Sequence, residues 1–221
     1  GVANLVSGPP GEISEEFVQN RAVSKISFTG SVPVGKELMA KSAERLVKLS
    51  LELGGHSPLI VCPDMDMDEA AELAVFGKFR NMGQVCISPT RFFVPEDRKA
   101  EFEKAAARRA SALRIGNGLE ADTDVDALHD KLRVASIEAL IEDAVQKGAK
   151  VLAGGKKPEG AKYEKGFWFE PTVLGGLAGE MALMKEEPFG PILPVIGYKD
   201  LDHAIEMAND TEFGLAGYVL T

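Results

Sequence analysis

The feature of this sequence that most constrains its fold is an alternation of short apolar runs with longer amphipathic segments along most of the chain. Apolar runs bounded by glycine, proline or polar residues are typical of β-strands, and apolar residues spaced three and four apart are typical of helices. Strands that alternate with helices favour an α/β protein with a parallel-rich sheet. The predicted strands are 24–29, 46–53, 57–62, 91–94, 151–155, 167–174, 192–197 and 216–220, and the predicted helices are 34–45, 66–81, 95–113, 130–147 and 201–209.

The charge balance excludes several classes of partner. The 221 residues carry 25 Lys and Arg against 34 Asp and Glu, which gives a formal net charge of −9. An acidic chain of this kind is not expected to bind nucleic acid or an anionic membrane non-specifically. The apolar runs, such as Pro58–Cys62, are too short to cross a bilayer. The first twenty residues also lack the basic and apolar regions of a secretory signal.

The two cysteines, Cys62 and Cys86, form no CxxC pair and no cluster with histidine. We therefore predict neither a disulfide framework nor a bound metal, and the free thiols indicate a cytoplasmic protein. Cys86 follows a glycine at the junction of a predicted helix and a predicted strand, where a thiolate could attack a carbonyl carbon. The alternative is a small buried side chain, which is the commoner fate of a free cysteine. Cys62 lies within an apolar run and is predicted to belong to the core.

A carboxylate and a histidine lie close together in sequence around the end of the second predicted strand. Glu52 lies on the polar face of that strand, just before two glycines, where it could act as a general base on water. The alternative is a solvated residue at the strand end. His56, His129 and His203 show no partner pattern, which weakens a Cys–His hydrolase reading, and His56 is expected at the surface or in a cap.

Two turns could contact a nucleotide. Gly30 and Ser31 begin a turn that leads through Pro33 into a helix, and backbone N–H groups at a helix start can bind an anion. The segment Glu186–Pro191 places a carboxylate and an aromatic ring in one rigid loop, so that it could accept bonds from ribose hydroxyls and support a flat heterocycle. The alternative for both is a purely structural turn.

Taken together and in this order, these motifs resemble the aldehyde dehydrogenase superfamily. The Ile87–Arg91 run is similar to the branch that holds semialdehyde dehydrogenases, succinate semialdehyde among their substrates. The matching pieces are Phe28–Ser31, Leu51–Gly55, Gly83–Cys86 with Arg91, Gly154–Gly155, Pro171–Val173, Glu187–Pro191, Asn209–Thr211 and Phe213–Leu215.

The resemblance implies a three-layer α/β/α catalytic domain at residues 51–221 and a remnant of a Rossmann-like NAD(P)-binding domain at residues 1–50. It implies that Cys86 attacks the aldehyde and becomes a thioester, and that Glu52 activates the hydrolytic water. Asn81, Gly83 and Gln84 would shape the loop that presents the thiol. The implied contacts to NAD or NADP are Gly30, Ser31, Leu53, Glu187 and Phe189.

The chain departs from the family pattern in its length. Family members carry a Pro-Trp-Asn motif that supplies an oxyanion donor, whereas the single tryptophan here is Trp168. Gly1 in place of Met indicates a processed or excised piece. We therefore expect the isolated chain to be inactive or nearly so, and the parent enzyme to be a homodimer or homotetramer acting on a small-molecule aldehyde. The alternative is a non-catalytic structural or assembly module that keeps the fold.

Overall fold

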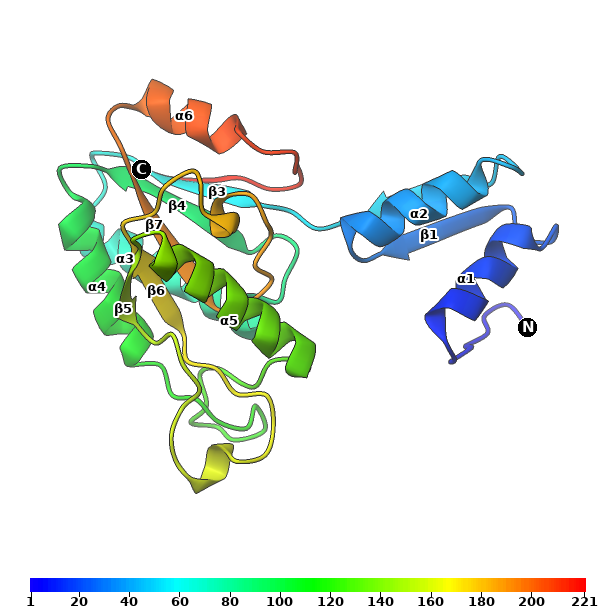
Figure 1. Cartoon of the computed structure of the whole chain (residues 1–221), viewed down its shortest axis with the longest axis horizontal. Helices are drawn as coiled ribbons and strands as arrows, with labels where there is room; N and C mark the ends of the chain where they lie inside the picture. Colours follow the sequence, from blue (N-terminus) through cyan, green and yellow to red (C-terminus); the bar gives the residue numbers. More distant parts are fainter. The chain divides into compact units, whose positions relative to one another are not determined.

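A computed structural model describes all 221 residues, which divide into two compact units, Gly1–Gly54 and Gly55–Thr221 (Figure 1). The division falls later than the boundary after residue 50 that the sequence suggests. The reason is the second strand, β2 (Lys48–Glu52), which pairs along its length with β1 (Lys25–Thr29) and so stays with the first unit. Each unit is described by itself below.

The first unit is a strand–helix–strand motif with one helix before it. Helix α1 (Pro10–Gln19) precedes β1, and α2 (Val32–Ser42) connects β1 to the parallel strand β2. Proline in the first turn of α2 has a backbone angle already suited to a helix start. The core of the unit is small and consists of Val18, Ile26 and Leu38. Helix α1 was not among the predicted helices.

The second unit is built on a six-stranded sheet in the order β5-β6-β7-β4-β3-β8. All neighbouring strands are parallel except β5, which runs antiparallel to β6. The predicted parallel-rich sheet is therefore confirmed. The strands are β3 (Ser57–Val61), β4 (Pro89–Pro95), β5 (Lys150–Ala153), β6 (Thr172–Gly175), β7 (Ile192–Tyr198) and β8 (Tyr218–Leu220).

Helices cover both faces of this sheet, so the expected α/β/α layering is also confirmed (Figure 1). The larger core joins one face to α3, α4 and α5, while the smaller core joins Ile60, Phe93 and Ile196 on the other face to Ala204 of α6. The helices are α3 (Met67–Phe79), α4 (Lys99–Ser111), α5 (Lys131–Gln146) and α6 (Leu201–Asn209), with single 3₁₀ turns at Arg80–Gly83, Ala161–Tyr163 and Ala182–Met184. No helix combines the length and apolar character needed to cross a bilayer.

Side-chain caps explain where three helices begin. The carboxylates of Asp66, Asp130 and Asp200 accept hydrogen bonds from backbone N–H groups in the first turns of α3, α5 and α6. Helix periodicity was less reliable at one position. Val145 is apolar like the buried residues of α5, but it is exposed because it lies beyond the buried stripe of Ile137, Ile141 and Ala144.

Candidate active site

The candidate nucleophile follows a tight left-handed segment at the end of α3. Asn81, Met82 and Gly83 have φ angles of 50°, 56° and 70°. Glycine suits the last of these positions because a Cβ atom there would overlap the carbonyl oxygen of Gly190. Met82 is anchored in the core, so the chain must turn sharply out of the helix before it reaches Cys86.

Side chains fix the path of this segment. The Asn81 amide donates to the Gln84 carbonyl oxygen at 3.0 Å, and the Gln84 amide donates back to the Asn81 carbonyl at 3.3 Å. The Gln84 side-chain oxygen also accepts from the backbone N–H of His129 at 2.9 Å. The loop before Cys86 is therefore tied both to itself and to the segment that precedes α5.

Cys86 lies in a hydrogen-bonded turn that the Ser88 N–H closes by donating to the Val85 carbonyl at 2.9 Å. The cysteine is partly exposed, whereas Ser88 is buried and leads into β4. The backbone N–H of Cys86 has no hydrogen-bond acceptor within the chain. A thiol with an unused N–H beside it can attack a carbonyl carbon and hold the resulting oxyanion.

A backbone N–H group holds the side chain of Glu187 in the region of Cys86. The N–H of Gly55 donates to Glu187 Oε1 at 3.2 Å, and Gly55 also packs against the carbonyl of Cys86. Burial raises the pKa of Glu187, while the Gly55 N–H and the charges of Arg133 and Lys78 act in the opposite direction. Gly55 thus contacts two predicted site residues, the backbone of Cys86 and the side chain of Glu187.

Phe189 follows Glu187 in the same loop and has a left-handed φ of 40°. The guanidinium of Arg133, on α5, lies over its ring at 5.2 Å from the centroid. A cation over an aromatic face is attracted by the negative π-face of the ring. This contact restrains the partly exposed ring of Phe189.

A buried cluster of three polar residues, Arg91, His56 and Thr90, was not predicted from the sequence. Arg91, on β4, donates to the His56 carbonyl and to the carbonyls of Met207 and Ala208 at the end of α6. His56 Nδ1 lies 2.9 Å from Thr90 Oγ1. The expectation that His56 is a surface or cap residue is therefore wrong, because the strand that follows it carries its side chain inward, and the side chain is only 1% exposed.

Cys62 also differs from its prediction. It lies one residue past the end of β3 and is partly exposed rather than part of the core. The apolar run on which the prediction rested ends with the strand at Val61, which is fully buried. Burial and the nearby Asp64 carboxylate raise the pKa of the Cys62 thiol, which makes it a weaker nucleophile at neutral pH.

In the first unit, the predicted cofactor and base residues meet at the carboxyl ends of β1 and β2. The Gly30 N–H donates to the Glu52 carbonyl at 3.0 Å, and Glu52 is exposed at the strand end. Leu53 packs on Gly35, where a Cβ atom would lie 2.7 Å from Leu53 Cδ2. Ser31 is the N-cap of α2, yet its side chain makes no capping hydrogen bond and remains exposed.

A cavity of about 560 Å³ lies within the first unit. It is lined mainly by apolar side chains of α1, β1 and α2, together with backbone of the glycine-containing segment before α1. Its lining is apolar, as in many small-molecule sites, and it contains none of the residues predicted to contact the cofactor.

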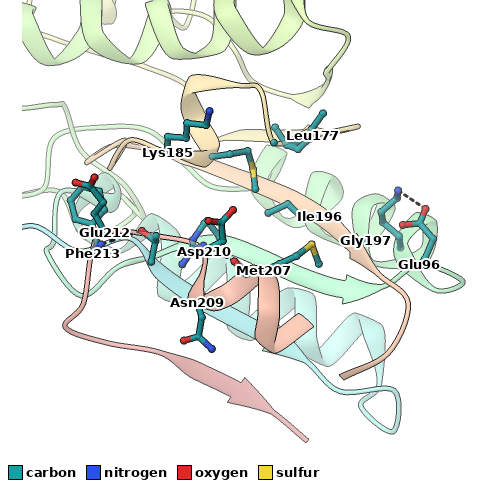
Figure 2. A pocket seen from close by; sticks show the side chains of 16 residues that line it. Glu96, Leu177, Lys185, Ile196, Gly197, Met207, Asn209, Asp210, Glu212 and Phe213 are labelled. Carbon is teal, nitrogen blue, oxygen red and sulfur yellow. Dashed lines mark hydrogen bonds and ion pairs between the residues drawn. The ribbon is translucent and has the colours of Figure 1, made fainter. Parts of the chain in front are cut away.

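A second cavity, of about 860 Å³, lies in the second unit over β7 (Figure 2). Lys185 and Leu177 border it on one side, and Met207 and Asp210 from the end of α6 border it on the other. None of the predicted site residues lines it. The position of a large cavity is therefore not what identifies the candidate active site.

Sequence reasoning named Cys86, Glu187 and Phe189 but missed the residues that hold them. Arg133 and Lys78 received no role, although Lys78 carried one usable signal as a charged residue inside the most apolar helix of the chain. The role of Gly55 as the contact between Cys86 and Glu187 depends on residues far apart in sequence, and no local pattern reveals it.

Comparison with known proteins identifies the family of the chain. The sequence model described as "Aldehyde dehydrogenase family" matches residues 1–221. A glutarate-semialdehyde dehydrogenase from Pseudomonas putida is 45% identical over 218 residues, which cover 99% of this chain and 44% of that protein. The NADP-dependent succinate-semialdehyde dehydrogenase of Escherichia coli is 42% identical and is likewise covered over 44% of its length.

Solved structures give the same result. A betaine aldehyde dehydrogenase from Staphylococcus aureus in complex with NAD⁺ superimposes with a TM-score of 0.95 at 34% identity, covering 99% of this chain and 43% of that chain. An NADP-dependent enzyme from E. coli gives a TM-score of 0.93 at 41% identity, with 99% and 44% covered. The chain belongs to the aldehyde dehydrogenase family, as the motifs predicted, and it spans less than half the length of these curated relatives.

Proposed function

We propose that this chain supplies the catalytic thiol and part of the dinucleotide site of an NAD- or NADP-dependent aldehyde dehydrogenase. The substrate is a small-molecule aldehyde, and the relatives that act on glutarate and succinate semialdehyde favour a semialdehyde. The observation that carries the proposal is the placement of Cys86, which is partly exposed in a fixed turn with its own N–H free and Glu187 held nearby through Gly55.

In the first step the Cys86 thiol gives its proton to solvent, and the thiolate forms a C–S bond to the aldehyde carbon while the electron pair of the C=O π bond moves to the oxygen, which becomes an oxyanion. The free N–H of Cys86 is positioned to donate to that oxyanion. Bound NAD⁺ or NADP⁺ would supply the acceptor for the hydride of the same carbon, and loss of that hydride would leave a thioester on Cys86. Water then attacks the thioester, the C–S bond breaks, and the acid and the free thiol are released.

Glu52 is the general base that we assign to the hydrolytic step. It takes a proton from the attacking water, so that the nucleophile approaches hydroxide in reactivity. This assignment rests on the family motif together with the exposure of the carboxylate at the end of β2. The residues assigned to the cofactor are Gly30, Ser31 and Leu53 in the first unit, none of which lines the cavity there, and Glu187 and Phe189 in the second unit.

The nucleophile is tested with Cys86→Ser in the protein as its gene encodes it, with Cys62→Ser as the matched control. We expect aldehyde-dependent formation of NADH or NADPH to be lost in the first variant and kept in the second. Retained oxidation in Cys86→Ser would show that the assigned nucleophile is wrong. If both thiols prove inert toward a chromogenic disulfide, a non-catalytic module becomes the better description.

The base is tested with Glu52→Gln. In this variant the acyl group should accumulate on Cys86 after one turnover, because the thioester forms but its hydrolysis is slowed by about 10²–10⁴-fold. Intact-mass measurement detects the adduct, and digestion locates it. A variant that turns over without accumulating an adduct would remove Glu52 from the mechanism.

The cofactor site in the first unit is tested with Ser31→Asp, which places a negative charge at the start of α2. We expect the Kd for the dinucleotide to rise at least about tenfold, since a carboxylate there repels the phosphate that the helix N–H groups would bind. Ser24→Asp, at another exposed position of the same unit, is the control and should leave the Kd unchanged.

Two further expectations belong to the same proposal. The isolated 221-residue chain should show little or no oxidation, since losing a single oxyanion donor costs about 10²–10³ in rate. The protein as its gene encodes it should form a homodimer or homotetramer, which light scattering checks. The cytoplasmic location also stays a prediction.

A further inference from the structure

Lys78 is a buried cation that the mechanism above does not use. It lies in the last turn of α3 and is fully buried, as few lysines are. Its ammonium donates to the Ser88 hydroxyl oxygen at 3.5 Å. Its Cε lies 3.1 Å from where a Cβ atom on Gly83 would stand. The side chain therefore runs beneath the loop that connects Gly83 to Ser88, with Cys86 on that loop.

Ser88 is the residue through which Lys78 reaches the thiol turn. Its N–H closes the turn around Cys86 by donating to Val85, and its side chain is only 4% exposed. Because the Lys78 ammonium donates to the Ser88 hydroxyl, it limits how far Ser88, and with it the turn around Cys86, can move. The position of Cys86 thus depends on a side chain that does not touch the thiol.

Lys78 also acts on Glu187, the residue assigned to the cofactor. Lys78 Cε lies 3.1 Å from where a Cβ atom on Gly83 would stand. The carbonyl oxygen of Gly190, in the loop that carries Glu187, lies even closer to the same point. The two opposite charges influence each other's pKa, that of Lys78 upward and that of Glu187 downward. Glu187 additionally accepts the Gly55 N–H at 3.2 Å. One buried ammonium is therefore coupled to both the thiol turn and the cofactor carboxylate.

A purely structural role does not account for this residue. Burial lowers the pKa of Lys78 to about 7, which means that the surroundings disfavour its charged form. A methionine would fill much of the same volume without that cost, and replacing a buried charge by an apolar side chain often stabilises a protein. A buried charge that weakens the fold while contacting the loop that carries Cys86 indicates selection for something other than stability.

We infer that Lys78 is a positioning residue that holds the Cys86 turn, through Ser88, and the Glu187 carboxylate in one fixed arrangement. The inference rests on the proposed function, in which Cys86 is the nucleophile and Glu187 contacts the cofactor. It predicts that removing the ammonium affects two measurable quantities at once, turnover through the thiol and affinity for the dinucleotide.

Tyr218 provides a matched comparison, because it restrains the same turn without a charge. Its hydroxyl, on β8, donates to the Ile87 carbonyl oxygen at 2.6 Å. Loss of this contact should loosen the turn beside Cys86 and leave Glu187 unaffected. Comparing the two variants separates a general loosening of the turn from the specific link to the cofactor site.

The experiment uses Lys78→Met and Tyr218→Phe in the protein as its gene encodes it, with steady-state kinetics for aldehyde and dinucleotide. Both variants should lower kcat by about tenfold or more, because small displacements of a nucleophile cost up to about 10²-fold. Only Lys78→Met should also raise the KM for the dinucleotide, at least fivefold. In a Glu187→Gln background, Lys78→Met should no longer change that KM.

The inference is overturned if Lys78→Met leaves kcat and the dinucleotide KM within twofold, or if it matches Tyr218→Phe in both. Should Lys78→Met fail to fold, Ser88→Ala keeps the buried charge and must lower kcat at least fivefold while leaving the dinucleotide KM unchanged; a change within twofold overturns the inference equally. These outcomes differ from failure of the proposed function, which is shown by retained oxidation in Cys86→Ser.

Discussion

Gly55 lies so close to Cys86 that a Cβ atom on it would stand 2.8 Å from the Cys86 carbonyl oxygen. The same atom would lie 3.2 Å from the carbonyl oxygen of Gly214. Real Cβ atoms do not approach backbone oxygens as closely as the first of these distances. A side chain at position 55 therefore fits only if the backbone moves. Gly55 therefore determines how close the turn around Cys86 can lie to β3 and to the loop that carries Glu187.

Gly55→Ala should displace the turn and change the reactivity of Cys86. We expect the rate of Cys86 alkylation by iodoacetamide to change at least about tenfold, consistent with the cost of displacing a catalytic atom. Gly77→Ala is the control, since its Cβ would make an ordinary 3.7 Å contact and alanine favours a helix by about 1 kcal/mol. Equal alkylation rates in Gly55→Ala and the unmodified protein would refute the argument.

Arg91 should be needed to keep α6 on the sheet. Its guanidinium donates four hydrogen bonds, at 2.8–3.0 Å, to the carbonyls of His56, Met207 and Ala208. The last two belong to the end of α6, where the Met207 carbonyl also accepts from the Asp210 N–H at 3.3 Å and the Ala208 carbonyl has no other partner. Arg91→Met leaves the carbonyls of His56 and Ala208 without a donor and should lower the free energy of unfolding by about 3–5 kcal/mol.

The control for Arg91 is Arg108→Met, which removes an exposed ion pair with Asp68 and should cost no more than about 1 kcal/mol. Urea denaturation gives both values, and hydrogen exchange of α6 shows whether the loss is local. Comparable destabilisation in the two variants would mean that Arg91 does not carry the attachment of α6.

The sequence predicted the parts of this molecule that depend on local chemistry. Helix α6 was predicted at its observed bounds, since Asp200 marks its start and its pattern is regular. Cys86, Glu52 and Ser31 were found from motifs because their chemistry requires particular residue types beside glycines. Strand β6 was predicted to begin at Phe167 but begins at Thr172, since the preceding residues pair with no strand.

The parts that the sequence did not reveal depend on contacts between distant segments. The burial of His56 follows from β4 and α6 closing over it, and nothing in the neighbouring residues indicates this. The positions of Lys78 and Arg133 under the thiol turn and over Phe189 arise only once α3, α5 and the loop before β7 are packed together. Fold class was therefore predictable and the reactive residues stay predictions, whereas the contacts that support the candidate site could not be predicted.

The buried histidine should make the protein sensitive to acid. The Thr90 hydroxyl donates to the Ser57 carbonyl at 3.3 Å, so it accepts from His56 Nδ1–H, and His56 Nε2 has no partner. Burial, with a contribution from the Arg91 charge, lowers the pKa of His56 to about 3. Between pH 3 and the ordinary value near 6.5, the unfolded chain binds a proton that the folded chain does not.

Stability therefore falls as pH is lowered through that range, by about 1.4 kcal/mol per pH unit for this one proton. His56→Asn removes the titrating group and should flatten the pH dependence of the unfolding free energy between pH 6 and pH 4 relative to the unmodified protein. His129→Asn, at an exposed position, is the control. Parallel curves for His56→Asn and the unmodified protein would exclude the effect.

Lys78 should produce a second pH dependence, in the alkaline range. Its pKa is lowered from 10.5 to about 7, chiefly by burial. Between these two values the unfolded chain holds a proton that the folded chain has released, so the free energy of unfolding rises with pH. Below pH 7 the folded chain carries the charged ammonium, and its full destabilising effect is present.

Lys78→Met removes that cost and should therefore raise the free energy of unfolding most below pH 7. The gain should shrink by up to about 1.4 kcal/mol for each pH unit above 7, because the unmodified protein loses the same penalty by deprotonation. Lys104→Met, on the exposed face of α4, serves as the control and should show no such trend. A stability gain that grows with pH would contradict the assignment. A variant that is more stable yet slower in turnover would show that the buried charge is kept for the site and not for the fold.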